Sequence, residues 1–420
     1  MSTTRRGLIS NFLSLFSVQV VNYIFPLITV PYVVRVIGPE KFGLVAFAQA
    51  LIQYFVVITD YGFNMSGTRK ISINRDDPVK TAEVFSTIMV LKTFFALLSA
   101  AALTAIVFSV DSLREEAPLY FFSFGAVLAN LLFPAWMLQG LERMKQLAAL
   151  SFSSSLILTF STFIFINETG DYVFLPIIYT LGPALSGLAS LYVIFFRLNI
   201  RFSAPSIDSL KKELKDGWHI FISMVSINIY LANNVLLLGL FSNPTIVGYY
   251  SAAEKITRAI QKLMSPAYQT LYPHVSRLSS ASRTEGLKFI NRTIKILGIP
   301  SFIISLLLLL FARQITGLVL GPQFEESVWA LRILSFIPFL VTLSTIYTMF
   351  FLVAFGHQEL WPRVVATATV FSLISGVIFA YVLGLGHIGI SVNALLTELL
   401  ILGMSLRYFR MFREKRPAAI

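Results

Sequence analysis

Long apolar runs are the feature that most constrains how this chain can fold. Stretches such as 12–32, 294–311 and 364–385 contain hardly any charged residues. A helix needs about 20 apolar residues to cross a bilayer core of about 30 Å. A surface helix of a soluble protein would show a polar face at every turn, and the strands of a membrane barrel would alternate with period two. The runs show neither pattern, so they predict helices that span a membrane.

The composition supports this class and excludes several kinds of active site. Hydrophobic residues make up 56% of the 420 residues and charged residues 13%, whereas soluble domains carry about 25% charged residues. There is no cysteine, which excludes disulfides and thiolate metal sites, and the four histidines show no metal-binding spacing. The glycine pattern at 384–389 lies between two apolar segments with no strand before it, so it does not indicate a dinucleotide site. We therefore predict no catalytic residues, no metal and no enzyme.

The apolar segments divide the chain into twelve predicted spans joined by short linkers. The first one is interpreted as a retained helix because no small-residue cleavage site precedes a hydrophilic region. The predicted spans are 11–34, 44–66, 82–110, 119–140, 147–166, 172–196, 219–241, 246–273, 289–312, 327–355, 364–384 and 388–406.

The distribution of Lys and Arg predicts the orientation of these spans. With the N-terminus in the cytoplasm, 22 of the 33 basic residues fall in cytoplasmic segments and 4 fall on the opposite face. This asymmetry is typical of the positive-inside rule. It places both ends of the chain in the cytoplasm. It also explains most of the net charge of +12 without a nucleic-acid partner.

The two halves of the chain are similar at a constant offset of 205 residues. Pro39, Gly43 and Ala48 correspond to Pro244, Gly248 and Ala253. Such a repeat indicates a duplicated unit of six helices, an arrangement that transporters use to form a site between halves. We expect an N-terminal lobe at 1–200, a basic amphipathic linker at 201–218 and a C-terminal lobe at 219–420.

Polar residues form a stripe on the second predicted span and on its equivalent in the second half. On a helix the first stripe occupies an arc of about 60° and the second an arc of about 120°. Polar stripes in lipid are costly, so we expect both to face a central water-filled cavity. The first stripe comprises Gln49, Gln53, Asp60 and Asn64, and the second includes Glu254, Lys255, Arg258, Gln261, Lys262 and Gln269.

The second stripe is basic, which suits an anionic ligand such as a phosphate. Lys255, Arg258 and Lys262 are the predicted ligands, and Arg332 could line the outer mouth of the cavity. An amphipathic helix with its basic residues among lipid head groups is the alternative interpretation. The uncharged polar candidates for lining the cavity are Gln49, Gln53, Asn64, Gln261 and Gln269.

Three carboxylates in the predicted spans could bind a coupling ion, either a proton or Na⁺. They are Asp60, Glu254 and Glu398, although a carboxylate beside basic residues can equally serve as a structural partner. Lys92 lies two to three turns inside its span. We interpret it as a residue that snorkels to the membrane surface.

Several motifs resemble those of bacterial O-antigen flippases. They are 35–43 at the first hairpin, 60–64 at the end of the second span, 134–145 after the fourth, 216–223 and 268–273. The segment from Pro134 to Lys145, which contains Trp136, Gln139 and Gly140, is the most specific of them. The resemblance covers nearly the whole chain.

This resemblance implies a fold like that of the multidrug and toxic-compound extruders, with two six-helix lobes around a central cavity. It implies a substrate, an undecaprenyl-pyrophosphate-linked oligosaccharide, that moves from the cytoplasmic to the periplasmic leaflet of the bacterial inner membrane by alternating access. With such a substrate, the predicted sugar-binding residues are the five uncharged polar candidates Gln49, Gln53, Asn64, Gln261 and Gln269. A cation gradient would drive this movement, with no other cofactor. Membrane lipids, a polysaccharide polymerase and a chain-length regulator are the implied partners. The alternatives are a cation-coupled exporter of drugs or metabolites, and a membrane scaffold for polysaccharide assembly.

Overall fold

The computed structural model of the chain describes residues 2–413, with side chains from Ile28 onward except at Leu231. The described residues form helices and no strand. The all-α membrane fold expected from the apolar runs is therefore confirmed. The predicted cytoplasmic charges of Arg5, Arg6, Lys415 and Arg416 lie outside the described side chains.

Contacts within the chain divide it into two compact units. The first unit comprises Met1–Ile37 and Phe47–Asn228, and the second comprises Gly38–Ala46 and Ile229–Ile420. Two helices pass from one unit to the other. They are α1 (Ser2–Asp60), which is broken at Gly38 (φ 73°), and α10 (Ile207–Phe241).

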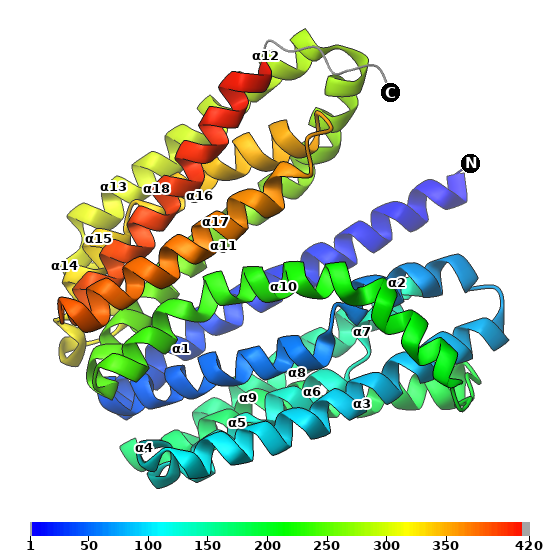
Figure 1. Cartoon of the computed structure of the whole chain (residues 1–420), viewed down its shortest axis with the longest axis horizontal. Coiled ribbons are helices and arrows are strands. Elements are labelled where there is room, and N and C mark those ends of the chain that lie inside the picture. The colour runs from blue at the N-terminus through cyan, green and yellow to red at the C-terminus, as the bar shows by residue number, and fades with distance from the viewer. Residues whose placement is uncertain (1, 414–420) are drawn as a thin grey trace. The chain divides into compact units, whose positions relative to one another are not determined.

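The first unit contains, besides its parts of α1 and α10, a bundle in which α8 and α9 lie side by side (Figure 1). Its other elements are α2 (Phe63–Asn74), α3 (Pro78–Ser109), α4 (Asp111–Glu115), α5 (Ala117–Ser123), α6 (Gly125–Leu132), α7 (Ala135–Gly140), α8 (Met144–Phe165), the 3₁₀ turn η1 (Thr169–Phe174), α9 (Leu175–Tyr192) and the π-helical segment η2 (Val193–Arg197).

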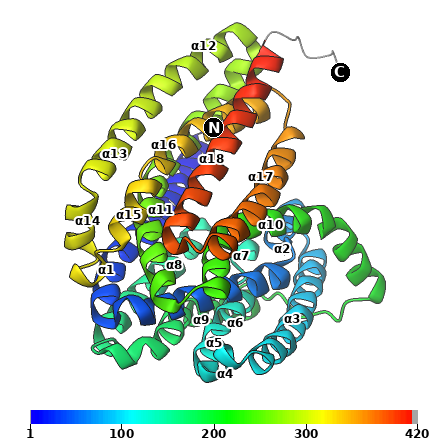
Figure 2. The ribbon, with the colours of Figure 1, turned by 60° about the vertical axis from the view of Figure 1, so that its left-hand side comes forward.

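The second unit contains a bundle in which α17 packs against α18 and α13 against α16, as Figure 2 shows. Its elements are α11 (Pro244–Ala281), α12 (Arg283–Thr293), η3 (Ile294–Gly298), α13 (Ile299–Leu310), α14 (Ala312–Val319), η4 (Pro322–Phe324), α15 (Ser327–Leu334), α16 (Ile337–Thr345), η5 (Ile346–Val353), α17 (Leu360–Val377), η6 (Ile378–Val382) and α18 (Gly386–Arg413). Of these, η3, η5 and η6 are π-helical and η4 is 3₁₀.

The count of twelve spans is not confirmed. Within the described residues, nine helices are long and apolar enough to cross a membrane, and a tenth is obtained if the bent α10 counts as one span. The helix α11 is not among them, because charged residues interrupt its apolar sequence. The protein is nevertheless a multi-pass membrane protein.

Local sequence signals set several helix boundaries. Asp77 caps α3 by accepting hydrogen bonds from the backbone N–H groups of Val79 and Lys80, and Asn243 caps α11 in the same way through Ile246. Each cap is followed by a proline at the first helical position, where its missing N–H costs nothing. The predicted linker 201–218 is helical from Ile207 onward, so its second half is the beginning of α10.

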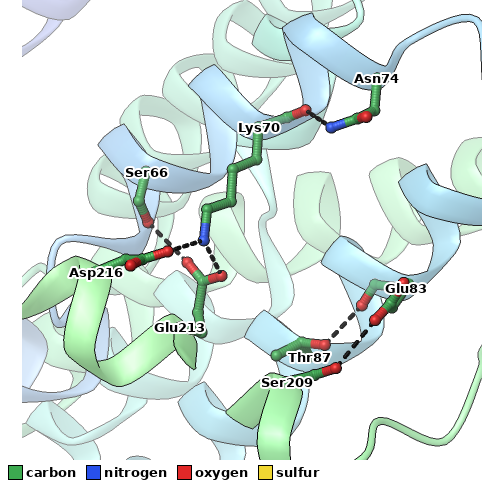
Figure 3. A network of polar contacts seen from close by, with 8 residues as sticks. All are labelled: Ser66, Lys70, Asn74, Glu83, Thr87, Ser209, Glu213 and Asp216. Atoms are coloured by element: carbon green, nitrogen blue, oxygen red, sulfur yellow. Dashed lines mark hydrogen bonds and ion pairs between the residues drawn. The ribbon is translucent and has the colours of Figure 1, made fainter. Parts of the chain in front are cut away.

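The beginning of α10 is held against α2 by a buried carboxylate in the first unit (Figure 3). Glu213 is 4% exposed. Its Oε2 accepts a hydrogen bond from Lys70 Nζ at 2.7 Å and its Oε1 accepts one from Ser66 Oγ at 3.1 Å. Lys70 Nζ also lies 2.9 Å from Asp216 Oδ2. Within the first unit, these contacts fix the polar beginning of α10 to α2.

The motif that follows the fourth predicted span has a packing role. Trp136 is 1% exposed, and a Cβ on Gly67 would lie 2.7 Å from its ring. A Cβ on Gly140 would lie 2.7 Å from the Ile71 side chain. The small residues thus allow α2 and α7 to approach closely, which explains why Trp and Gly occur together in this segment.

Candidate functional site

A polar cavity of about 70 Å³ lies inside the second unit, between α10, α11, α15, α16, α17 and α18. Four residues that the sequence singled out for three different roles line it together. They are the predicted phosphate ligand Arg258, the predicted sugar ligand Gln261 and the predicted ion-binding residues Glu254 and Glu398.

Arg258 faces the cavity as half of an ion pair. Its Nη2 lies 2.8 Å from Glu254 Oε1, one helical turn earlier on α11. The same oxygen accepts a hydrogen bond from the Tyr250 hydroxyl at 3.3 Å, and Asn234 Nδ2 donates to that hydroxyl at 3.1 Å. The pairing explains how a guanidinium can be accommodated among apolar helices, because an isolated charge there would be very costly.

Glu398, on α18, is the second carboxylate of the cavity and is 8% exposed. It accepts a hydrogen bond from the Tyr230 hydroxyl of α10. Five residues earlier on α18, Asn393 Nδ2 donates to Asn234 Oδ1 at 2.9 Å, and Asn393 Oδ1 accepts from Ser375 Oγ at 2.5 Å. Hydrogen bonds therefore connect four helices of the second unit, α10, α11, α17 and α18.

The other predicted phosphate ligands have different neighbours. Lys255 Nζ lies 4.8 Å from the ring centre of Phe42, and the guanidinium of Arg332 lies 4.9 Å from that of Trp329, both cation–π distances. Lys262 is exposed, as is Gln269, whose Nε2 donates to Ser265 Oγ at 3.3 Å. The structure therefore brings Arg258 to the cavity and leaves Lys255, Lys262 and Arg332 outside its lining.

The polar stripe of the first half lies on α1 and α2, and all four of its residues fall in the first unit. Gln49 is half-buried and Asn64 is exposed. Gln53 Nε2 donates to Asn228 Oδ1 at 3.2 Å.

The interpretation of Lys92 as a snorkelling residue is wrong. Its side chain is 1% exposed, and its Nζ lies 3.0 Å from Asp60 Oδ1. The physical reason is that a carboxylate on another helix lies within ion-pair distance, and pairing stabilises a buried charge. Asp60 is thus the partner of a buried lysine.

Sequence reasoning missed the residues that connect this cavity to its surroundings, namely Tyr230, Asn234, Tyr250 and Asn393. They are uncharged, so they do not stand out among apolar residues as Glu254, Arg258 and Glu398 do. Asn234 and Asn393 carry side-chain amides inside membrane spans. Because such residues hydrogen-bond between helices there, they could have been recognised from the sequence as candidates. Among the side chains described, no group of three His, Asp or Glu residues could hold a metal ion.

Comparison with known proteins relates the chain to membrane transporters. Residues 8–279 match the family described as polysaccharide biosynthesis protein. The "Putative O-antigen transporter" of Escherichia coli (strain K12) is 31% identical over 410 residues, which cover 98% of each chain.

Two solved structures share the fold. An inward-facing multidrug resistance MATE family transporter of the MOP superfamily is 19% identical and has a TM-score of 0.74, covering 95% of this chain and 96% of its own. Lipid II flippase MurJ, in an inward closed conformation, is 14% identical and has a TM-score of 0.72, covering 96% of this chain and 87% of its own. These similarities confirm the predicted MATE-like fold.

Proposed function

The chain belongs to the polysaccharide biosynthesis protein family, and we propose that it is a flippase for lipid-linked polysaccharide repeat units. Its substrate would be an undecaprenyl-pyrophosphate-linked O-antigen unit, or one of a similar surface polysaccharide. The unit would move from the cytoplasmic to the periplasmic leaflet of the bacterial inner membrane. The observation that carries the proposal is the end-to-end similarity to a relative named as an O-antigen transporter.

The chemistry of the head group supports a basic binding site. A pyrophosphate cannot enter hydrocarbon unaided, because its hydration is lost without replacement. Arg258, Lys255 and Lys262 on α11, with Arg332, could replace that hydration through charge-assisted hydrogen bonds. The amides of Gln49, Gln53, Asn64, Gln261 and Gln269 could bind sugar hydroxyls while the lipid tail stays in the bilayer.

The proposed transport cycle is alternating access between two lobes, driven by a cation gradient. Both ends of the chain would lie in the cytoplasm, as the charge asymmetry predicts. A polysaccharide polymerase and a chain-length regulator would then receive the unit on the other side.

A cation-coupled exporter of drugs or metabolites is the second candidate, since a MATE transporter shares the fold. The two candidates differ in the charge that the site must carry. An anionic head group needs the positive charges of α11, whereas a cationic drug would be repelled by them.

The deciding experiment removes these positive charges in cells that lack the native gene. We expect Arg258→Ala/Lys262→Ala to abolish surface polysaccharide and to leave the lipid-linked unit in the cytoplasmic leaflet, at normal protein levels. Because Arg258→Ala leaves Glu254 without its ion-pair partner, Lys262→Ala alone, at an exposed position, is the variant least at risk of misfolding.

The matched control is Lys211→Ala/Lys212→Ala, which removes two exposed charges from α10 and should export normally. Normal export by the double α11 variant at normal protein levels would overturn the proposal.

A further inference from the structure

The cavity of the second unit holds one more acidic than basic group. The ionisable residues that line it are Glu254, Glu398 and Arg258, with the phenols of Tyr230 and Tyr250. The residues that α15, α16 and α17 contribute to the lining are Leu334, Ile337 and Ser372, none of which carries charge. If both carboxylates were ionised, the cavity would carry a net negative charge.

The two carboxylates differ in their partners. Glu254 is matched by the guanidinium of Arg258 at 2.8 Å. Glu398 is hydrogen-bonded to the neutral hydroxyl of Tyr230, and Arg258 is the cation that acts on it electrostatically. One guanidinium shared by two carboxylates cannot balance both, and an unbalanced charge inside a membrane helix is costly.

From this arrangement we infer that Glu398 is a reversible proton-binding site and that its proton is the ion that couples transport. The inference rests on the proposed flippase function and deepens it. Proton uptake converts the Glu398 carboxylate to the neutral acid, so the cavity changes from negative to neutral without any other group altering its charge.

The neighbours of Glu398 favour a proton over Na⁺. A sodium ion needs several oxygen ligands and no nearby cation, yet Arg258 lines the same cavity and would repel it. The amide oxygens of Asn234 and Asn393 each already accept a hydrogen bond, from Asn393 Nδ2 and Ser375 Oγ respectively. A proton needs only the one carboxylate oxygen that is present.

The position of Tyr230 connects the proton to the conformation of the chain. It lies on α10 directly after Asn228 and Ile229, where the helix passes from the first unit to the second. An ionised Glu398 accepts a charge-assisted hydrogen bond from Tyr230, whereas the protonated acid accepts a weaker, neutral one. Protonation would therefore loosen the attachment of α10 to α18 within the second unit, two residues after the boundary that α10 crosses.

Difference infrared spectroscopy on the purified full-length protein in lipid tests this site directly. Exposed carboxylates are ionised at about pH 6 and above. We expect the wild type to show the carbonyl band of a protonated carboxylic acid at about pH 6 and to lose it by about pH 10. The band should be absent in Glu398→Gln, and shifted in frequency in Tyr230→Phe, because the phenol no longer bonds to the group.

The matched control is Glu285→Gln, which removes an exposed carboxylate from α12 and should leave the band unchanged. A wild-type protein without the band, or a band that persists in Glu398→Gln, would overturn the inference. Since Glu398→Gln could fold poorly, the frequency shift in Tyr230→Phe provides a second readout, and an unshifted band there also counts against the inference.

Transport measurements separate this inference from the proposed function. In vesicles loaded with the lipid-linked unit, Glu398→Gln should lose the acceleration that a pH gradient gives to the wild type. Acceleration by a Na⁺ gradient alone would overturn the proton as coupling ion. If the band is present but the wild type moves no lipid-linked unit, the flippase proposal fails while the proton site stands.

Discussion

Gly43 and Gly248 occupy equivalent places in a reciprocal contact within the second unit. A Cβ on Gly43 would lie 1.8 Å from the carbonyl oxygen of Pro244, and a Cβ on Gly248 would lie 1.9 Å from that of Pro39. The offset of 205 relates Gly43 to Gly248 and Pro39 to Pro244, so each helix start packs against the other in the same way. A two-fold contact of this kind is what two copies of one ancestral hairpin would make. It supports the internal duplication.

This contact predicts that alanine is not tolerated at either glycine. Gly43→Ala and Gly248→Ala each place a methyl group against backbone, which cannot move aside as a side chain can, so we expect about 3 kcal/mol of destabilisation. Thermal unfolding in detergent would measure it. Gly403→Ala, on α18, is the control, because nothing lies within 4 Å of its added Cβ. Equal stability of Gly43→Ala and Gly403→Ala would contradict the backbone contact.

The buried pair of Lys92 and Asp60 predicts a strong effect of removing one charge and a small effect of removing both. Lys92→Met should destabilise the protein by about 2–3 kcal/mol, because Asp60, whose side chain is 18% exposed, is left as an unpaired and largely buried charge. Adding Asp60→Asn should restore most of that loss. The comparison is made by unfolding both variants in the same lipid, with Lys80→Met as the exposed control. A double variant no more stable than Lys92→Met would contradict the pairing.

The hydrogen bonds of the buried Glu213 carboxylate predict that the beginning of α10 separates from α2 more readily when this carboxylate is removed. Glu213→Ala should cost about 1–3 kcal/mol, since Lys70 and Ser66 lose a buried acceptor. Because the chain has no cysteine, a single Ser209→Cys can report this opening through its rate of thiol labelling. We expect faster labelling in Glu213→Ala than in Glu285→Ala. Equal rates would argue against a role of Glu213 in holding α10 against α2.

The capping of α3 by Asp77 predicts that the stability of the first turn of this helix depends on pH. The pKa of the Asp77 carboxyl is lowered, chiefly because it accepts a hydrogen bond from the backbone N–H of Lys80. A carboxyl whose pKa is lower in the folded state contributes stability above its unfolded pKa and loses it as the pH falls through the folded value. At the start of α3 the protection of the amides against hydrogen exchange, measured relative to the intrinsic exchange rate at each pH, should therefore fall under acid conditions in the wild type. In Asp77→Asn, which cannot titrate, this acid dependence should disappear.

The membrane class, the helical character and the family could all be predicted from the amino-acid sequence. Apolar runs allow few structures in a bilayer, because each backbone N–H and C=O must find its partner within the segment. The motif 134–145 identified the family, and its Trp136 and Gly140 proved to pack α7 against α2. Capping residues such as Asp77 and Asn243 act over three residues, so they too are visible locally.

The partners of the polar side chains were decided by the tertiary structure. Periodicity placed Glu254 and Arg258 on one face of α11, yet it could not show that Glu398, far along the chain, lines the same cavity. Nor could it pair Asp60 with Lys92, or assign Gly38–Ala46 to the second unit. Burying a helix against lipid needs only its own apolar residues, which the sequence displays. Stabilising a buried charge needs a particular partner on another helix, and only the packing of the helices selects it.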